Sequence, residues 1–191
     1  MAVKPSNMLP LGTKAPGFDL INAVDGERVS LDDFESAPAL LVMFICNHCP
    51  YVQHIRSELG RLASDYMDEG LAIVAINSND SDAYPQDGPE HMRRLAREEG
   101  WEFPFLFDEE QEVARAYRAV CTPEFYLFDA DRRLVYHGQL DDSRPGMADP
   151  TGRDLRAAID AVLSGDRLPE DQRPSVGCSI KWKPAKRPDY A

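Results

Sequence analysis

The segment Cys46-Asn47-His48-Cys49-Pro50 holds the residue types and the spacing best suited to chemistry. It follows an apolar run over residues 39–45 and opens a stretch with helical periodicity, so the two cysteines lie at a strand-to-helix junction. Free backbone N–H groups and the positive end of the helix dipole favour a thiolate at such a place. A second cysteine two residues away can close a disulfide with the first. We therefore predict redox chemistry for this pair.

A structural role for the two cysteines is the main alternative at this point. Zinc sites usually add a second Cys-x-x-Cys or a pair of histidines, and neither follows Cys49 at zinc spacing. A soft metal such as Cu(I) or zinc is still a hypothesis, with Cys46, His48, Cys49 and Cys121 as its ligands. Under that hypothesis the protein is a binding module and not an enzyme. Redox chemistry is favoured, and no metal or other cofactor is expected.

The composition of the chain limits its domain count and its partners. A chain of 191 residues with 43% hydrophobic residues fits one domain, or one domain with a tail. The formal net charge of -12 argues against nucleic acid or an anionic membrane as partner. The first residues lack an apolar signal core, and four cysteines are too few for a secreted disulfide scaffold of this length. We expect a cytoplasmic protein.

Hydrophobic patterns predict alternating strands and helices. Residues 18–22 and 28–31 flank Asp25-Gly26 as a hairpin, and Pro104 suggests that the strand over 103–107 lies at a sheet edge. The remaining elements are expected as buried strands over 39–45 and 71–76, helices over 49–66, 90–99 and 109–117, a strand pair over 124–129 and 132–137, a helix over 153–163 and a tail from 165. This order predicts an α/β fold with a mixed sheet.

Together these features resemble the thioredoxin superfamily. The Cys46–Cys49 motif lies between a strand and a helix, and Thr122-Pro123 directly precedes a strand. An extra strand and helix over 103–117 stand between the two motifs, as in the branch that contains peroxiredoxins and extracytoplasmic thiol-disulfide proteins. The resemblance covers residues 10–165. It implies a mixed central sheet flanked by helices, with a cis Thr122-Pro123 bond that faces the cysteines.

The chain also resembles a subgroup of peroxiredoxin-like, redoxin-domain (AhpC-TSA-like) proteins. Cys-Asn-His-Cys-Pro-Tyr-Val from Cys46 is typical of this subgroup, as is the late segment Gly177-Cys178-Ser179-Ile180-Lys181-Trp182-Lys183. The resemblance implies a thioredoxin-like domain over residues 1–165. It also implies that residues 166–191 form a C-terminal tail that packs on or near this domain.

The roles of the two cysteines depend on the branch. In the thioredoxin-type mechanism Cys46 is the more exposed residue and attacks, and Cys49 resolves the mixed disulfide. In the peroxiredoxin-type mechanism Cys49, before Pro50, is the peroxide-reactive residue, although Cys46 stands where that pattern has threonine. Both assignments stay open. A protonated His48 would stabilise the Cys46 thiolate, or it would face solvent with little effect.

Three further residues are candidates by their position in the resemblance. Glu124 beside Pro123 is a possible base, although an exposed strand residue is the favoured interpretation. Cys121 is either a third redox thiol or a small core residue. Cys178 would resolve a disulfide if the tail folds back over the site. For the loop residues Asp141, Asp142 and Arg144 we favour a solvated turn.

We expect a thiol-disulfide oxidoreductase in which Cys46 and Cys49 cycle between dithiol and disulfide, in redox homeostasis or antioxidant defence. The alternative enzyme is a thiol-dependent peroxidase that uses Cys49 or Cys46. The expected substrate is a protein or small-molecule disulfide or a peroxide. The expected reductant is a thiol system such as thioredoxin or glutathione.

Overall fold

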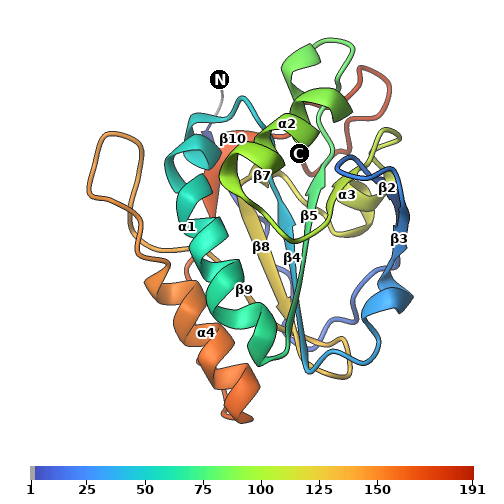
Figure 1. Ribbon diagram of the computed structural model, residues 1–191. Coiled ribbons are helices and arrows are strands. Elements are labelled where there is room, and N and C mark those ends of the chain that lie inside the picture. Colours follow the sequence, from blue (N-terminus) through green and yellow to red (C-terminus); the bar gives the residue numbers. More distant parts are fainter. Residues whose placement is uncertain (1–2) are drawn as a thin grey trace.

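The computed structural model describes residues 3–191, in which two sheets are flanked by helices (Figure 1). The larger sheet has the strand order β3-β2-β6-β5-β4-β8-β9. Its strands are β2 (Asp19–Asn22), β3 (Arg28–Ser30), β4 (Ala39–Phe44), β5 (Leu71–Asn77), β6 (Phe105–Phe107), β8 (Glu124–Phe128) and β9 (Leu134–Gly138). This mixed sheet confirms the predicted α/β class, and β2 and β3 form the predicted antiparallel hairpin.

Strand β4 is an interior strand of the sheet and leads directly into the cysteine motif. It runs parallel to β5 and antiparallel to β8, and all six of its residues are buried. An unbroken apolar sequence suits a strand that is covered on both faces. Its alternate side chains enter two different core clusters, with Met43 in one and Phe44 in the other. The cysteine motif therefore directly follows a strand that is paired on both edges and buried on both faces.

Helices cover both faces of the sheet. The helices are α1 (Pro50–Tyr66), α2 (Pro89–Glu99), α3 (Glu112–Ala116) and α4 (Arg153–Ser164), with 3-10 turns at η1 (Leu31–Phe34), η2 (Met67–Glu69) and η3 (Pro85–Asp87). Residues of α1, α2 and α4 share one core cluster, and α3 packs into the other cluster with the N-terminal segment. The buried side chains of α1 recur as Val52, Ile55, Leu59, Leu62 and Tyr66, as the periodicity predicts.

Two details of the predicted elements are wrong. Strand β6 lies between β2 and β5 and not at an edge. Pro104 is tolerated because it precedes the strand, where its carbonyl oxygen accepts the N–H of Ala75 at 2.9 Å. Helix α3 is shorter than predicted, although Asp108 does accept the N–H groups of Val113 and Ala114 at its start.

The second sheet joins the two ends of the described chain. Its order is β1 (Val3–Pro5), β10 (Val176–Ser179) and β7 (Cys121–Thr122), all antiparallel. The segment expected as a tail therefore contains a strand, β10, and another strand, β1, lies close to the N-terminus. Figure 1 shows β10 beside the start of α1, where the cysteine motif lies. Within residues 3–191, no helix is long and apolar enough to cross a membrane.

Candidate redox site

The paired cysteines lie where β4 passes into α1. Cys49 is the N-cap residue of α1 and Pro50 is the first helical residue. Thr122 of β7 contacts both cysteines: its Oγ1 lies 3.3 Å from Cys46 Sγ, and its carbonyl oxygen lies 3.1 Å from Cys49 Sγ. The Thr122-Pro123 peptide bond is cis, as the resemblance implied. The structure thus brings Cys46, Cys49, Thr122 and Pro123 together.

Both cysteines are buried. Cys46 is 1% exposed and Cys49 is 0% exposed, so neither is accessible and exposure does not single out Cys46 as the attacking residue. Strand β10 contributes to this enclosure, because it pairs with β7, lies beside α1 and brings Cys178 against Cys49. All four cysteines of the chain are present as free thiols.

The surroundings favour the thiolate at Cys49 and the thiol at Cys46. Hydrogen bonding to Cys46 is the largest influence on Cys49, and with bonds from Cys178 and the Val52 N–H it lowers the pKa of Cys49 to about 5. Burial opposes this shift without reversing it, and a hydrogen bond from the Thr122 side chain lowers the pKa of Cys49 further. The same interaction with Cys49, together with burial and the charge of Asp87, raises the pKa of Cys46 well above its ordinary value. The helix start adds its own positive field at Cys49.

Cys178 belongs to the same cluster of thiols. In β10 it lies opposite Thr122 in the strand register and is almost fully buried. Burial and the interaction with Cys49 raise the pKa of Cys178 to about 12, so at neutral pH it is a proton donor. The tail therefore does fold back over the site.

His48 is held by a carboxylate that the sequence analysis does not single out. Its Nδ1 pairs with the buried Asp87, and its ring stacks on Tyr84 at 5.2 Å between centroids. Asp87 also accepts the backbone N–H groups of Asn47 and His48 and the amide of Asn79. Burial alone would raise the pKa of Asp87, but the bonds from His48 and Asn79 hold it below its usual value. A solvent-facing His48 is therefore wrong, and the charged group that influences Cys46 is Asp87.

Glu124 is fully buried, so an exposed strand residue is also wrong. Its Oε2 accepts the N–H groups of Val120 and Cys121, and its Oε1 accepts the Tyr126 hydroxyl at 2.9 Å. His137 Nε2 lies 2.9 Å from Oε1. Since His137 Nδ1 accepts the N–H of Leu9, its Nε2 carries the proton and donates to Glu124.

This arrangement makes Glu124 an internal anchor. Its two oxygens accept five donors, the fifth being the Cys121 thiol, and no hydrogen bond joins it to Cys46 or Cys49 among the described residues. Cys121 is equally enclosed: burial and the charge of Glu124 raise the pKa of its thiol well above the ordinary value. Geometry therefore favours Cys121 as a core thiol.

A metal-binding geometry is partly present. One ligand atom from each of Cys46, His48 and Asp87 lies within 4.8 Å of the others. Asp87 replaces Cys49 and Cys121 of the expected ligand set. Because this carboxylate already accepts several hydrogen bonds, a metal would have to displace them. The soft-metal hypothesis stays a prediction, and metal content of protein purified without chelator tests it.

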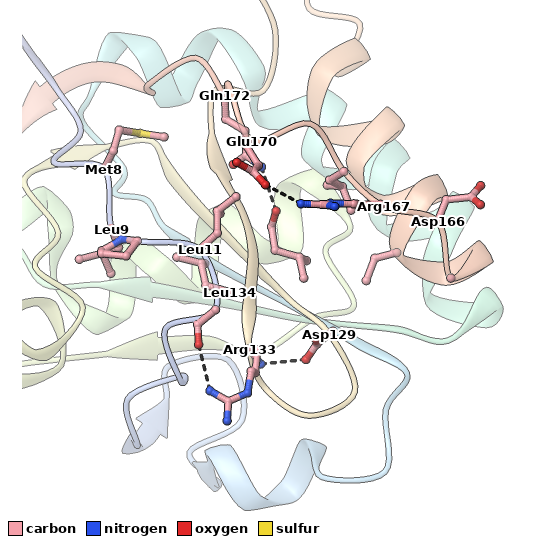
Figure 2. Close-up of a pocket in the computed structure, with 16 residues that line it drawn as sticks. Met8, Leu9, Leu11, Asp129, Arg133, Leu134, Asp166, Arg167, Glu170 and Gln172 are labelled. Carbon is pink, nitrogen blue, oxygen red and sulfur yellow. Dashed lines mark hydrogen bonds and ion pairs between the residues drawn. The ribbon is translucent and has the colours of Figure 1, made fainter.

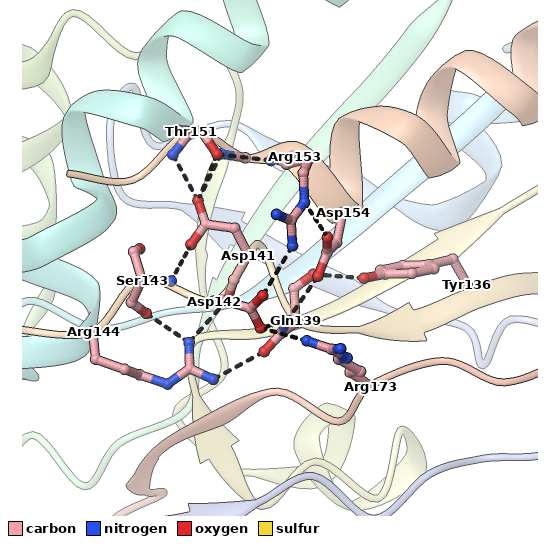
Figure 3. Close-up of polar contacts among 11 residues, drawn as sticks. Tyr136, Gln139, Asp141, Asp142, Ser143, Arg144, Thr151, Arg153, Asp154 and Arg173 are labelled. Atoms are coloured by element: carbon pink, nitrogen blue, oxygen red, sulfur yellow. Dashed lines mark hydrogen bonds and ion pairs between the residues drawn. The ribbon is translucent and has the colours of Figure 1, made fainter. Parts of the chain in front are cut away.

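The loop after β9 is ordered by ion pairs, so a solvated turn does not describe it (Figure 3). Asp141 is buried and accepts the N–H groups of Ser143, Thr151 and Gly152. Asp142 pairs with Arg153 and with Arg173. The Arg144 guanidinium donates to the Asp141 carbonyl and to Gln139. This loop forms one wall of a narrow recess beside Pro123, and the start of α1 forms another.

A wide hollow of the surface is formed by residues outside the thiol cluster. A cavity of about 890 Å³ is lined by residues 8–12, by β9 and by the segment after α4, with the Arg167–Glu170 ion pair on its rim (Figure 2). None of the four cysteines lines it. The candidate site is therefore the covered thiol cluster and not the open cavity.

The fold and the thiol pair define the class: a thioredoxin-fold protein with a Cys-x-x-Cys motif at the start of a helix. Residues 11–137 match the model of the AhpC/TSA family. The chain belongs to this family. The family match and the named relatives place it among peroxiredoxin-like and thiol-disulfide oxidoreductases.

Three proteins illustrate the range of similarity. The crystal structure of an uncharacterized conserved protein from Geobacillus kaustophilus is 58% identical, with a TM-score of 0.93, over 96% of this chain and 98% of that one. A Mycobacterium tuberculosis protein named "Putative peroxiredoxin" is 28% identical over 123 residues, which are 64% of this chain and 72% of that protein. The thioredoxin domain of a thiol-disulfide oxidoreductase from Bacteroides vulgatus is 21% identical, with a TM-score of 0.58, over 68% of this chain and 89% of that one. This last likeness concerns the fold alone.

Proposed function

We propose that the protein is a thiol-disulfide oxidoreductase in which Cys49 attacks the oxidant and Cys46 resolves the product. The observation that carries this proposal is the pair of free thiols at the start of α1, where Cys46 and the helix stabilise a Cys49 thiolate. Of the two assignments that the sequence leaves open, this is the one with Cys49 as the reactive residue. Thr122 and Pro123 form the wall against which the two sulfurs lie.

The reaction consumes one equivalent of a two-electron oxidant. With a disulfide, the Cys49 thiolate attacks one sulfur, the oxidant's S–S bond breaks and one thiol leaves. Cys46 then loses its proton and attacks Cys49, which releases the second thiol and forms the Cys46–Cys49 disulfide. An external thiol reductant, such as the thioredoxin or glutathione system, returns the pair to the dithiol.

Peroxide reduction is the second candidate function. It is favoured by the position of Cys49 directly before Pro50 at a helix start and by the AhpC/TSA match. The Cys49 thiolate would attack one peroxide oxygen, the O–O bond would break, and the other oxygen would leave as water or an alcohol after it takes up a proton, so that Cys49 becomes a sulfenic acid. Cys46 would then displace water and form the same disulfide. The departure at position 46, where the peroxiredoxin pattern has threonine, argues against a fast peroxidase.

The experiment reacts reduced protein with one equivalent of hydrogen peroxide in a stopped-flow instrument and maps the products by mass. Formation of a Cys46–Cys49 disulfide supports the proposal. A rate far above that of an ordinary thiol selects the peroxidase, and a rate like that of a free thiol selects the disulfide exchanger. Absence of the Cys46–Cys49 disulfide with either peroxide or a low-mass disulfide contradicts both functions. The cytoplasmic location and the identity of the reductant stay predictions.

A further inference from the structure

The outer edge of β7 is the place where an extended peptide would pair next to the paired sulfurs. Backbone pairing to a free strand edge is a general mode of peptide recognition. In this protein the edge is occupied, because β10 pairs with it antiparallel. Cys178 stands opposite Thr122, and Ser179 stands opposite Cys121. A cysteine of the chain itself therefore occupies the position where an incoming peptide would present its own cysteine.

The fit between β10 and β7 is close enough to require glycine. A Cβ atom on Gly177 would lie 2.0 Å from the Thr122 carbonyl oxygen and 3.1 Å from the Pro123 nitrogen. Both contacts are with backbone, which cannot rotate away. Gly177 thus lets β10 approach the wall of the site more closely than any residue with a side chain would.

Contacts on both sides keep β10 in place. Its second edge pairs with β1, where Val3 stands opposite Cys178. Before the strand, the Ser175 hydroxyl donates to the Gly138 carbonyl at 2.7 Å. After it, the N–H of Ile180 donates to the Val120 carbonyl at 3.0 Å, and the N–H of Lys181 donates to the Asn79 side chain at 2.8 Å.

We propose that β10 is a built-in occupant of the peptide-pairing edge of β7. In this position it holds Cys178 as a second disulfide partner for Cys49, and it restricts the folded protein to low-mass oxidants. The inference rests on the proposed function, because it assigns the substrate class and a third thiol to the same site. A low-mass disulfide needs only a small opening to reach Cys49. An extended peptide needs β10 to leave its edge.

Cys178 is the third thiol, and it takes part in a thiol-disulfide exchange with Cys49. The Cys49 thiolate attacks a low-mass disulfide, the S–S bond of that oxidant breaks, and one low-mass thiolate leaves and takes up a proton. Cys178 loses its proton and attacks the Cys49 sulfur, which forms the Cys49–Cys178 disulfide and expels the second low-mass thiol. Two protein thiols are oxidised and one disulfide is reduced.

The first test removes the competing partner. Reduced Cys46→Ser protein is treated with one equivalent of hydroxyethyl disulfide, and the products are mapped by mass. We expect a Cys49–Cys178 disulfide without a remaining adduct. In the Cys46→Ser/Cys178→Ser protein, the hydroxyethyl group should stay on Cys49. The matched control is Cys46→Ser/Cys121→Ser, which removes a different buried thiol and should still form the Cys49–Cys178 bond.

A stable adduct on Cys49 in the Cys46→Ser protein would overturn the role of Cys178. The proposed function would survive this result if the wild-type protein still forms the Cys46–Cys49 disulfide. A wild-type protein that forms neither disulfide would contradict the proposed function itself. The two failures are therefore distinguishable.

The second test measures the size restriction. Wild-type protein should react at least about tenfold more slowly with a disulfide embedded in an extended peptide than with hydroxyethyl disulfide, because β10 must first leave its edge. A tenfold difference corresponds to an opening free energy of about 1.4 kcal/mol. Gly177→Ala forces β10 outward and should reduce this difference. Gly17→Ala is the matched control, since nothing lies within 4 Å of a Cβ there. Equal rates for peptide and low-mass disulfide in the wild type would overturn the restriction.

Gly177→Ala could also prevent folding, so a milder variant keeps this test decisive. Ser175→Ala removes the hydroxyl that bonds to Gly138 and leaves the strand pairing intact. It should also reduce the peptide discrimination, by less than Gly177→Ala. An unchanged ratio in a folded Ser175→Ala protein, together with an unchanged ratio in a folded Gly177→Ala protein, would contradict the role of β10.

Discussion

At the scale of single residues, the site gives two chemically identical thiols different pKa values. Cys49 has hydrogen bonds from two thiols and a backbone N–H at a helix start. Cys46 has a buried thiol partner and the charge of Asp87 nearby, and both favour its protonated form. Because one proton is shared within the pair, the lowered pKa of Cys49 and the raised pKa of Cys46 depend on each other. The reactive thiol is then chosen by surroundings and not by accessibility, since both are buried.

The pH dependence of alkylation follows from the lowered pKa of Cys49. A group with a pKa of about 5 is ionised at neutral pH, and the thiolate is the reactive form. The rate of iodoacetamide reaction at Cys49 should be constant above about pH 6 and should fall as the pH drops through about 5. Mass mapping of each cysteine over a pH series measures this. A midpoint near the ordinary thiol value of 9.0 would contradict it.

The alkylation midpoint of Cys49 also tests the influence of Cys46. Cys46→Ala removes the hydrogen bond that most lowers the pKa of Cys49, so the midpoint should move upward. Cys121→Ala is the control, because it also removes a buried thiol but one that bonds to Glu124. Its midpoint should match the wild type.

Asp87 should contribute to the raised pKa of Cys46, after the hydrogen bond with Cys49 and burial. Asp87→Asn removes the charge that raises the pKa of Cys46 and replaces one accepting oxygen by an NH₂ group. We expect the pKa of Cys46 to fall. We also expect the free energy of unfolding to drop by about 1–3 kcal/mol, because buried donors lose their acceptor. Alkylation of Cys46 against pH and urea unfolding measure the two effects. Asp82→Asn, at an exposed position of the same loop, should change neither.

At the scale of elements, patterns in the sequence predict what is local. The apolar run before Cys46 and the periodicity after it place β4 and α1 correctly, because both signals come from adjacent residues. Thr122 and Pro123 are predicted by their resemblance to a family motif and not by hydrophobic pattern or helix and strand propensity. Asp87 carries no comparable signal: it lies in a polar loop, and only the folded chain brings it to His48. Gly177 and Cys178 are visible as a motif, whereas their pairing with Thr122 depends on contacts across more than fifty residues.

Glu124 joins several elements at one point, which its sequence position does not reveal. It accepts hydrogen bonds from Cys121 of β7, from Tyr126 of β8 and from His137 of β9. Through His137 it is also linked to the N-terminal segment at Leu9. A strand residue beside a proline would ordinarily be assigned to the surface, and burial of a carboxylate is tolerated here only because every oxygen is hydrogen-bonded.

Glu124→Gln should therefore destabilise the protein without a direct effect on Cys46 or Cys49. The amide group keeps the shape but turns one acceptor into a donor that faces other donors, which costs about 1–3 kcal/mol. Thermal or urea unfolding measures the loss, and the alkylation midpoint of Cys49 should stay unchanged. Glu102→Gln is the matched control at an exposed position and should leave stability unaltered. A shifted Cys49 midpoint in Glu124→Gln would instead show that Glu124 acts on the site.

At the scale of the whole molecule, both ends of the described chain are built into the site. Strand β1 lies near the start and β10 near the end, and together with β7 they form the sheet that covers the thiols. The segments after β10 are tied to the body by Gln111, which accepts the N–H of Lys183 at 2.8 Å. Residues 166–191 are therefore a separate tail only if they detach from the domain without unfolding it.

Urea can distinguish a local opening from global unfolding. The slope of an opening free energy against urea concentration grows with the surface that the opening exposes. Release of β1 and β10 exposes much less surface than unfolding of the whole chain, so its slope should be much smaller. We expect alkylation of Cys49 and Cys178 to rise only weakly in urea below the unfolding transition. Cys121 faces Glu124 in the interior, so its alkylation should follow the slope of global unfolding. Equal, steep slopes for all three cysteines would mean that the thiols are reached only when the whole molecule unfolds, and such a protein could not turn over its oxidant in the native state.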